Sequence, residues 1–249
     1  MANFVKVRAA LAALACLAGV AVTQSAGADP RTDSPASTGD LEKLAQQQTS
    51  LLLKHYVGVN VSPQKCGQGQ GSAGVDGVFL LPVASYGPGD RAIDCKTTAR
   101  SVLVDLGGFT ITEDNRFPAS SWFLNGQDVA FTPDTLGPIC EDLFTQGVIA
   151  GPMPATLDGG RSITGQRVNS GVFTARVNRH AQIPRDADLY ADSVALGHPG
   201  RLATLFCGFK AVVHLPPGTH TIVVDYSTLF GASTLFTYDI TVRGVHRAH

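Results

Sequence analysis

Two histidines near the C-terminus are the first side chains in this sequence that could do chemistry. His214 and His220 flank the turn Pro216–Thr219. If Leu215 pairs with His220 across this turn, the two imidazoles point to opposite faces of a hairpin and cannot share a metal ion. A lone histidine on a strand seldom has a full set of metal ligands. We therefore expect His220 to pack at the end of a sheet, with a ring N–H bonded to a backbone carbonyl.

Three aspartates around Tyr190 form a second candidate site. Asp186, Asp188 and Asp192 could offer the hard oxygen ligands that calcium prefers. The glycine of an EF-hand loop is missing, however, and an aromatic residue stands at position 190. A solvated acidic loop is the favoured interpretation, and a calcium site is the alternative.

Trp122, His198 and His220 are the candidate ligand-binding residues. Trp122 is the single tryptophan; exposed, it would offer a surface for sugar stacking, and buried, it would anchor the core. Its neighbours Phe123 and Leu124 favour the core. His198 or His220 would belong to an enzyme site if the fold brought a carboxylate to either of them.

Motifs for cofactor chemistry are weak or absent. The sequence has no G-x-S-x-G, H-E-x-x-H or G-K-[ST]. Residues 69–74 read G-x-G-x-x-G, but no strand precedes them and no helix follows, as a dinucleotide site requires. We therefore expect no cofactor. The net charge of −1 gives no indication of nucleic-acid binding.

The elements that would position these residues are mainly strands. Apolar residues alternate through 211–215, 222–226 and 234–242, which predicts a three-stranded meander. Pro217-Gly218 fits a type II turn, which requires a positive φ at Gly218. Further short strands are expected at 75–83, 101–106, 109–112 and 168–177, with a tight hairpin around Asn125-Gly126 and one helical turn around Cys140.

The resulting fold prediction is an all-β antiparallel sandwich, immunoglobulin-like or jelly-roll-like, with one N-terminal peripheral helix. The amphipathic helix is expected over 40–57, its apolar stripe packed on the sheet or on a partner. A glycine-rich loop follows at 58–74, the sandwich covers 75–243, and 244–249 is a tail.

The first 28 residues have the three parts of a secretory signal peptide, which predicts a secreted protein. Cleavage after Ala28 would leave a flexible leader over 29–39 and no segment that could span a membrane. Cleavage before Cys16, as in a lipoprotein, is the alternative.

Four cysteines remain after this cleavage: Cys66, Cys95, Cys140 and Cys207. An even number in an exported chain indicates two disulfides, and spacing permits three pairings. We expect Cys66–Cys95, which closes a loop around the glycine-rich segment, and Cys140–Cys207, which ties the Cys140 turn to the last strands. A Cys95–Cys207 bond would overturn this assignment.

Several segments occur in an order that resembles a known group of proteins: FLLPV (79–83), SVLVDLGG (101–108), LDGG (157–160), RVNSGVF (167–173) and CGFKAVVHLPPGTHTI (207–222). The chain resembles widespread, uncharacterised exported bacterial β-sandwich proteins with a closing P-x-G-x-H-T-I hairpin. It departs from their pattern at 96–99 and at Cys207. The resemblance implies a fold and export, and no activity.

Three functions are consistent with these observations. The first is a secreted, non-enzymatic module that binds a cell-surface or extracellular ligand. The second is an extracellular hydrolase whose site is assembled from distant Asp and His residues. The third is a structural envelope protein that docks through its N-terminal helix. A pocket that gathers titratable side chains would favour the second, and a bare helix stripe would favour the third.

Overall fold

A computed structural model describes residues 38–55, 66, 77–82, 89–179, 182–183, 187–230 and 232–244. They belong to one compact unit, Ser34–His249. The predicted signal peptide, nearly all of the leader and most of the glycine-rich loop lie outside the described residues. None of the described helices is both long and apolar enough to cross a membrane.

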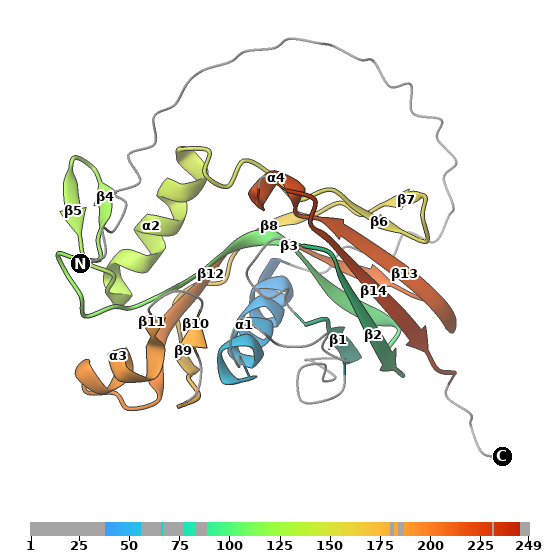
Figure 1. Cartoon of the computed structure of the whole chain (residues 1–249), viewed down its shortest axis with the longest axis horizontal. Helices are drawn as coiled ribbons and strands as arrows, with labels where there is room; N and C mark the ends of the chain where they lie inside the picture. The colour runs from blue at the N-terminus through green and yellow to red at the C-terminus, as the bar shows by residue number, and fades with distance from the viewer. Residues whose placement is uncertain are drawn as a thin grey trace, which may run out of the picture. The chain divides into compact units, whose positions relative to one another are not determined.

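The described chain is rich in strands, most of which form two five-stranded sheets (Figure 1). In the β3–β12 sheet the order is β1-β3-β12-β8, with β9 also paired to β12. Its strands are β1 (Val78–Leu80), β3 (Ser101–Thr112), β8 (Gln166–Asn169), β9 (Phe173–Arg176) and β12 (Arg201–His214). In the β13–β14 sheet the order is β2-β14-β13-β6-β7. Its strands are β2 (Arg91–Thr97), β6 (Ala155–Leu157), β7 (Arg161–Ser162), β13 (Gly218–Asp225) and β14 (Leu235–Val242).

The remaining elements lie outside these two sheets. Two small ribbons are formed by β4 (Trp122–Leu124) with β5 (Gln127–Val129), and by β10 (Gln182–Ile183) with β11 (Ala187–Asp188). The helices are α1 (Thr38–His55), α2 (Pro133–Thr145), α3 (Leu189–Ala195) and the short α4 (Ser227–Phe230). The sequence analysis expected only α1 and one helical turn near Cys140.

Both large sheets contribute to one hydrophobic core. Alternate residues of β3 and β12 meet alternate residues of β2, β13 and β14 there, for example Val104, Val213, Ile93, Val224 and Phe236. The sheets are mixed, however, because β1 runs parallel to β3 and β2 runs parallel to β14. The β-rich prediction holds, but the purely antiparallel pairing that the sequence analysis expected does not.

The predicted hairpin across Pro216–Thr219 is wrong. β12 pairs with β3, β8 and β9, whereas β13 pairs with β14 and β6, so the turn carries the chain from one sheet to the other. Leu215 donates its backbone N–H to Arg100 and does not pair with His220. The alternation of apolar residues cannot distinguish a hairpin within one sheet from a turn between two facing sheets. Leu215 and Ile222 face the same core in either case. The third strand was predicted correctly, as β14 pairs with β13 along its whole length.

The apolar stripe of α1 is covered by the β3–β12 sheet. Leu41, Leu44 and Ala45 are buried against residues of that sheet that include Leu103 and Phe206. The stripe was expected to pack either on the sheet or on a partner, and in the structure it packs on the sheet.

Strand β3 contains a bulge where it crosses β12. Gly108 lies opposite Gly208, and Asp105 lies opposite Lys210, so β3 has one residue more than β12 between these pairs. A Cβ atom on Gly108 would lie 2.3 Å from the carbonyl oxygen of Cys207, and one on Gly208 would lie 2.3 Å from that of Gly107. The two backbones approach this closely only because both positions are glycine. The bulge also forms the floor of the groove described next.

Candidate functional site

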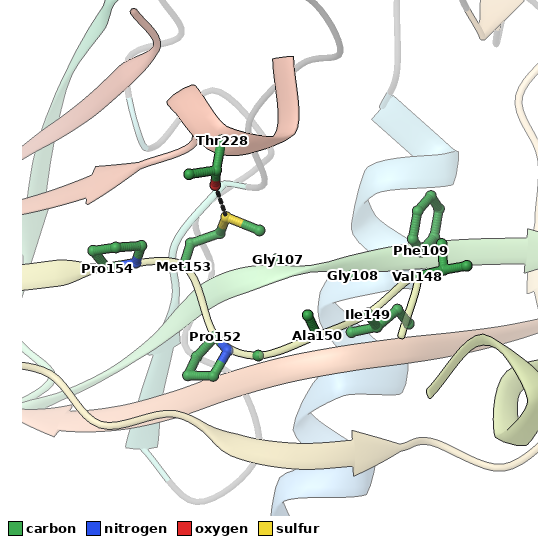
Figure 2. Close-up of a pocket in the computed structure, with 11 residues that line it drawn as sticks. Gly107, Gly108, Phe109, Val148, Ile149, Ala150, Pro152, Met153, Pro154 and Thr228 are labelled. Atoms are coloured by element: carbon green, nitrogen blue, oxygen red, sulfur yellow. Dashed lines mark hydrogen bonds between the residues drawn. The ribbon is translucent and has the colours of Figure 1, made fainter. Parts of the chain in front are cut away.

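A groove lies along β3 where the segment 148–154 passes over it (Figure 2). We call it the β3 groove, and its volume is about 470 Å³. Its floor is the glycine bulge with Phe109, one wall is the segment after α2, and Thr228 of α4 lies over Met153 of that wall. The lining residues are Gly107, Gly108, Phe109, Val148, Ile149, Ala150, Gly151, Pro152, Met153, Pro154 and Thr228.

The chemistry of the β3 groove is apolar. None of its lining residues has a titratable side chain. The Thr228 hydroxyl, its single polar side-chain group, donates to Met153 Sδ at 3.5 Å. Phe109 and Val148 both line the groove (Figure 2) and are 38% and 49% exposed, more than is usual for large apolar side chains. The groove can therefore receive an apolar group, but it offers nothing for acid–base or nucleophilic catalysis.

Backbone hydrogen bonds hold the wall of the groove in place. The Ile149 N–H donates to Leu143 at the end of α2, and the Met153 N–H donates to Leu106 of β3 at 2.8 Å. The Pro154 carbonyl in turn accepts from Asp225 at 2.8 Å. Both ends of the wall are thus fixed to regular structure, which leaves the groove formed before any ligand arrives.

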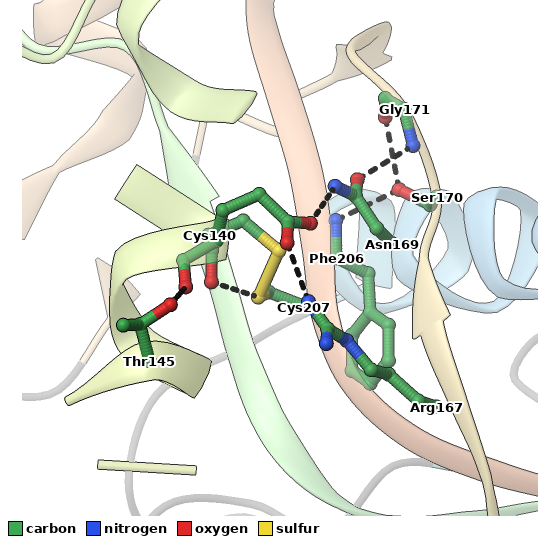
Figure 3. Close-up of a disulfide and its surroundings, with 9 residues drawn as sticks. Cys140, Thr145, Arg167, Asn169, Ser170, Gly171, Phe206 and Cys207 are labelled. Carbon is green, nitrogen blue, oxygen red and sulfur yellow. Dashed lines mark hydrogen bonds and ion pairs between the residues drawn. A yellow bond between two sulfur atoms is a disulfide. The ribbon is translucent and has the colours of Figure 1, made fainter. Parts of the chain in front are cut away.

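The Cys140–Cys207 disulfide fastens α2 to β12 (Figure 3). The two Cα atoms are 5.7 Å apart, and both residues are fully buried. The Glu141 carboxylate beside the bond accepts from Arg167 and Asn169 of β8. Helix α2 is longer than the single turn that was predicted around Cys140, and it continues through Gly137 and Pro138.

The second disulfide joins Cys66 to Cys95 of β2, with a Cα–Cα distance of 4.6 Å. The Cys66 N–H also donates to the Asp94 carbonyl at 3.1 Å. The two bonds are the pairs that the sequence analysis expected, and no Cys95–Cys207 bond is present. Such bonds indicate an oxidising environment outside the cytoplasm.

His220 forms a pair with Asp158 of the β6–β7 turn. Its Nδ1 lies 3.0 Å from Asp158 Oδ2, and its Nε2 lies 2.9 Å from the Pro216 carbonyl oxygen. The hydrogen bond from His220 holds the pKa of the Asp158 carboxyl below its usual value, helped by the Thr221 N–H. Both ring nitrogens are thus in contact with groups of the chain itself, the Asp158 carboxylate and the Pro216 carbonyl. The bond to a backbone carbonyl is the one expected from the sequence, and the ring is on the face of Ile222.

The other two candidate ligand-binding residues lie apart from the β3 groove. Trp122 is half-buried against the α2 cluster and donates Nε1–H to Asp142 Oδ2 at 2.7 Å. Its exposed neighbour on β4 is Phe123. His198 is exposed in the turn between α3 and β12, where its backbone N–H donates to Ser193.

The aspartate cluster shows no metal site in the part that can be described. Asp186 lies outside the described residues, and for Asp188 only the backbone is described. Asp192 lies in α3, and its charge contributes to raising the pKa of Arg116, after the larger effect of the hydrogen bond from Arg116 to Asp114. Among the side chains that the structure describes, no group of three or more His, Cys, Asp or Glu could hold a metal ion.

Comparison of the chain with protein-family models, curated proteins and solved structures finds no match. Sequence reasoning missed the β3 groove because glycine, proline, alanine and valine form no chemical motif. Two signals were present: the Gly107-Gly108 pair inside a strand, which indicates a bulge or a close approach, and the Gly151–Pro154 run, which cannot continue a helix.

Proposed function

We propose that the protein is an exported, non-enzymatic β-sandwich module that binds a small, uncharged, mainly apolar ligand in the β3 groove. The observation that carries the proposal is the groove itself, preformed and lined only by apolar residues, glycines and one threonine. Its volume of about 470 Å³ is within the range typical of ligand pockets. The two disulfides support a place outside the cytoplasm. The resemblance to exported bacterial β-sandwich proteins is part of this proposal.

Two observations make the other functions weaker proposals. A hydrolase would need a free base, yet both ring nitrogens of His220 are bonded and the β3 groove contains no carboxylate. An envelope protein that docks through α1 would need its apolar stripe free, but that stripe is buried on the β3–β12 sheet.

The uncharged dye Nile red is a suitable probe, since its emission increases and shifts to shorter wavelength in an apolar site. We expect the folded protein to bind it with saturation. Val148→Asp places a carboxylate at the rim of the groove, where a bound apolar molecule would desolvate it. This should weaken binding roughly ten- to hundredfold, because burying a charge costs at least about 1–3 kcal/mol.

Val172→Asp is the matched control, because Val172 is 42% exposed against 49% for Val148 and does not line the groove. It should bind the dye as the wild type does. Dye binding that is equal in both variants, or no saturable binding by the folded wild type, would exclude the β3 groove as the ligand site.

A further inference from the structure

The most unusual charged residue of the described chain is Lys210, in the middle of β12. Its side chain has no exposed area, whereas lysine is almost never fully buried. It lies directly opposite Asp105 of β3, whose side chain is only 5% exposed. Lys210 Nζ and Asp105 Oδ2 are 2.8 Å apart. A primary amine is thus held against a carboxyl group where bulk water has no access.

We propose that Lys210 and Asp105 condense into an intramolecular isopeptide bond between β12 and β3. Lys210 Nζ attacks Asp105 Cγ, the new N–Cγ bond forms, the Cγ–Oδ2 bond breaks, and one water molecule leaves. The product is a neutral secondary amide between the two side chains. No oxidant, reductant, cofactor or second enzyme enters the reaction.

The protons of this reaction balance within the pair. An ammonium and a carboxylate enter, and Nζ loses two of its three protons, both of which leave with Oδ2 as water. The first transfer follows the existing contact from Nζ to Oδ2 and leaves a neutral, nucleophilic amine. Burial lowers the pKa of the Lys210 ammonium, although the Asp105 charge opposes this effect. Desolvation therefore favours the amine form that the attack requires.

The neighbouring groups suit both the reaction and its product. The Gly107 N–H donates to Asp105 Oδ1 at 2.8 Å, where negative charge develops when Nζ adds to Cγ. Gln48 Oε1 of α1 accepts from Nζ at 2.6 Å, and the Gln48 amide is itself fixed by donating to the Leu81 carbonyl at 2.7 Å. In the product, the amide oxygen keeps the bond from Gly107 and the amide N–H keeps the bond to Gln48.

The unreacted ammonium has fewer oxygen acceptors than N–H donors, whereas the single N–H of the amide has one acceptor. An ammonium has three N–H donors, and within the described chain Nζ finds two acceptor atoms, one on Gln48 and one on Asp105. Its remaining side faces the Phe206 ring, with Nζ 3.7 Å from the ring centroid. The amide has a single N–H and carries no charge, so the reaction removes two charges from a buried site.

Intact-mass measurement of the folded, full-length protein, after unfolding and reduction of both disulfides, tests the proposal. The expected mass is lower than that of the linear chain by one water. Protease digestion should give a branched peptide that joins Lys210 to Asp105. A folded wild-type protein that keeps the full linear mass after prolonged incubation would overturn the proposal.

Two variants distinguish the isopeptide bond from other reactions that also remove one water from the chain. Asp76-Gly77 and Asp158-Gly159 are sites where an aspartate can lose water to form a succinimide. Lys210→Met removes the nucleophile and should restore the full mass, whereas a succinimide would persist. In Asp105→Asn the same attack releases ammonia, so the loss should change from one water to one ammonia. A loss of water that stays the same in both variants, or a branch at another lysine, contradicts the assignment.

Discussion

The crossing of β3 and β12 at Gly108 should be the position of the described chain least tolerant of a methyl group. Gly108→Ala adds a Cβ atom 2.3 Å from the Cys207 carbonyl oxygen and 2.6 Å from the Cα atom of Gly208. Ordinary contacts begin at 3.4 Å, so the two backbones would have to separate by about 1 Å. Both partners are backbone atoms of a central ladder, which cannot rotate away as a flexible side chain would.

Two costs add at this position. Gly108 has a φ of +145°, and placing a Cβ atom at a positive φ costs about 1–2 kcal/mol. Overpacking a closely packed site costs a further 1–3 kcal/mol or so. The free energy of unfolding should therefore fall by about 2–5 kcal/mol, a large part of the roughly 5–15 kcal/mol that holds a domain folded.

Comparing the urea unfolding of Gly108→Ala with that of Gly171→Ala separates the backbone cost of a positive φ from the cost of overpacking. Gly171 also has a positive φ, +66°, but a Cβ atom there would meet nothing within 4 Å. Gly171→Ala should lose only the backbone cost, about 1–2 kcal/mol. Equal losses in the two variants would show that the close approach of the strands contributes nothing, and the reasoning on the crossing would be refuted.

Three further predictions concern the pairs around the sheets. His220→Ala should lower the free energy of unfolding by about 1 kcal/mol and raise the pKa of Asp158, measured by NMR titration. Because the Asp158 pKa is lowered in the folded protein, the contribution of Asp158 to stability is present above its unfolded-state pKa. This contribution is lost as the pH falls through the folded-state pKa. An Asp158 titration that is unchanged in His220→Ala would contradict the prediction. Replacing Cys140 and Cys207 together by serine opens a loop with a sequence separation of 67. The free energy of unfolding in urea should fall by about 4 kcal/mol. A fall below 1 kcal/mol or so would show that the disulfide hardly constrains the unfolded chain. Trp122→Phe should lower the free energy of unfolding by about 1 kcal/mol through the lost hydrogen bond to Asp142. Added oligosaccharides should leave the tryptophan emission of the wild type unchanged, and a saturable change would restore the sugar-binding hypothesis.

Local patterns in the sequence predicted the elements that local physics determines. The β4–β5 hairpin has a positive φ at Asn125 and at Gly126, as an Asn-Gly turn requires. Helix α1 was predicted within two residues of its observed start at Thr38. The strand segment predicted over 168–177 corresponds to β8 and β9, which are separated by residues 170–172 around Gly171.

Pairing between distant strands could not be predicted in the same way. A strand that alternates apolar and polar residues has the same pattern whether its neighbour is parallel, antiparallel or in the facing sheet. This is why the turn at Pro216–Thr219 was interpreted as a hairpin. Strand β2 was not among the predicted strands, although its buried residues Ile93 and Cys95 alternate with charged ones.

The candidate site was the least predictable part. The sequence offered titratable and aromatic side chains as candidates, whereas the structure places His220 in a hydrogen-bonded pair and Trp122 against α2. The β3 groove depends instead on the absence of side chains at Gly107 and Gly108, and on a wall supplied from about 40 residues further along the chain. Such a concavity exists only after distant segments have come together.

The place of β14 determines when this domain can be completed as the chain is made or exported. β14 lies between β13 and β2, and its register sets Phe236 beside Arg91. A chain that emerges from its N-terminus therefore presents the edge of β2 without its neighbour until β14 has appeared. Non-local pairing of this kind folds slowly and leaves a strand edge open to aggregation. The Cys66–Cys95 bond needs only the first 95 residues or so, so in an oxidising compartment β2 can be tied down covalently long before β14 arrives.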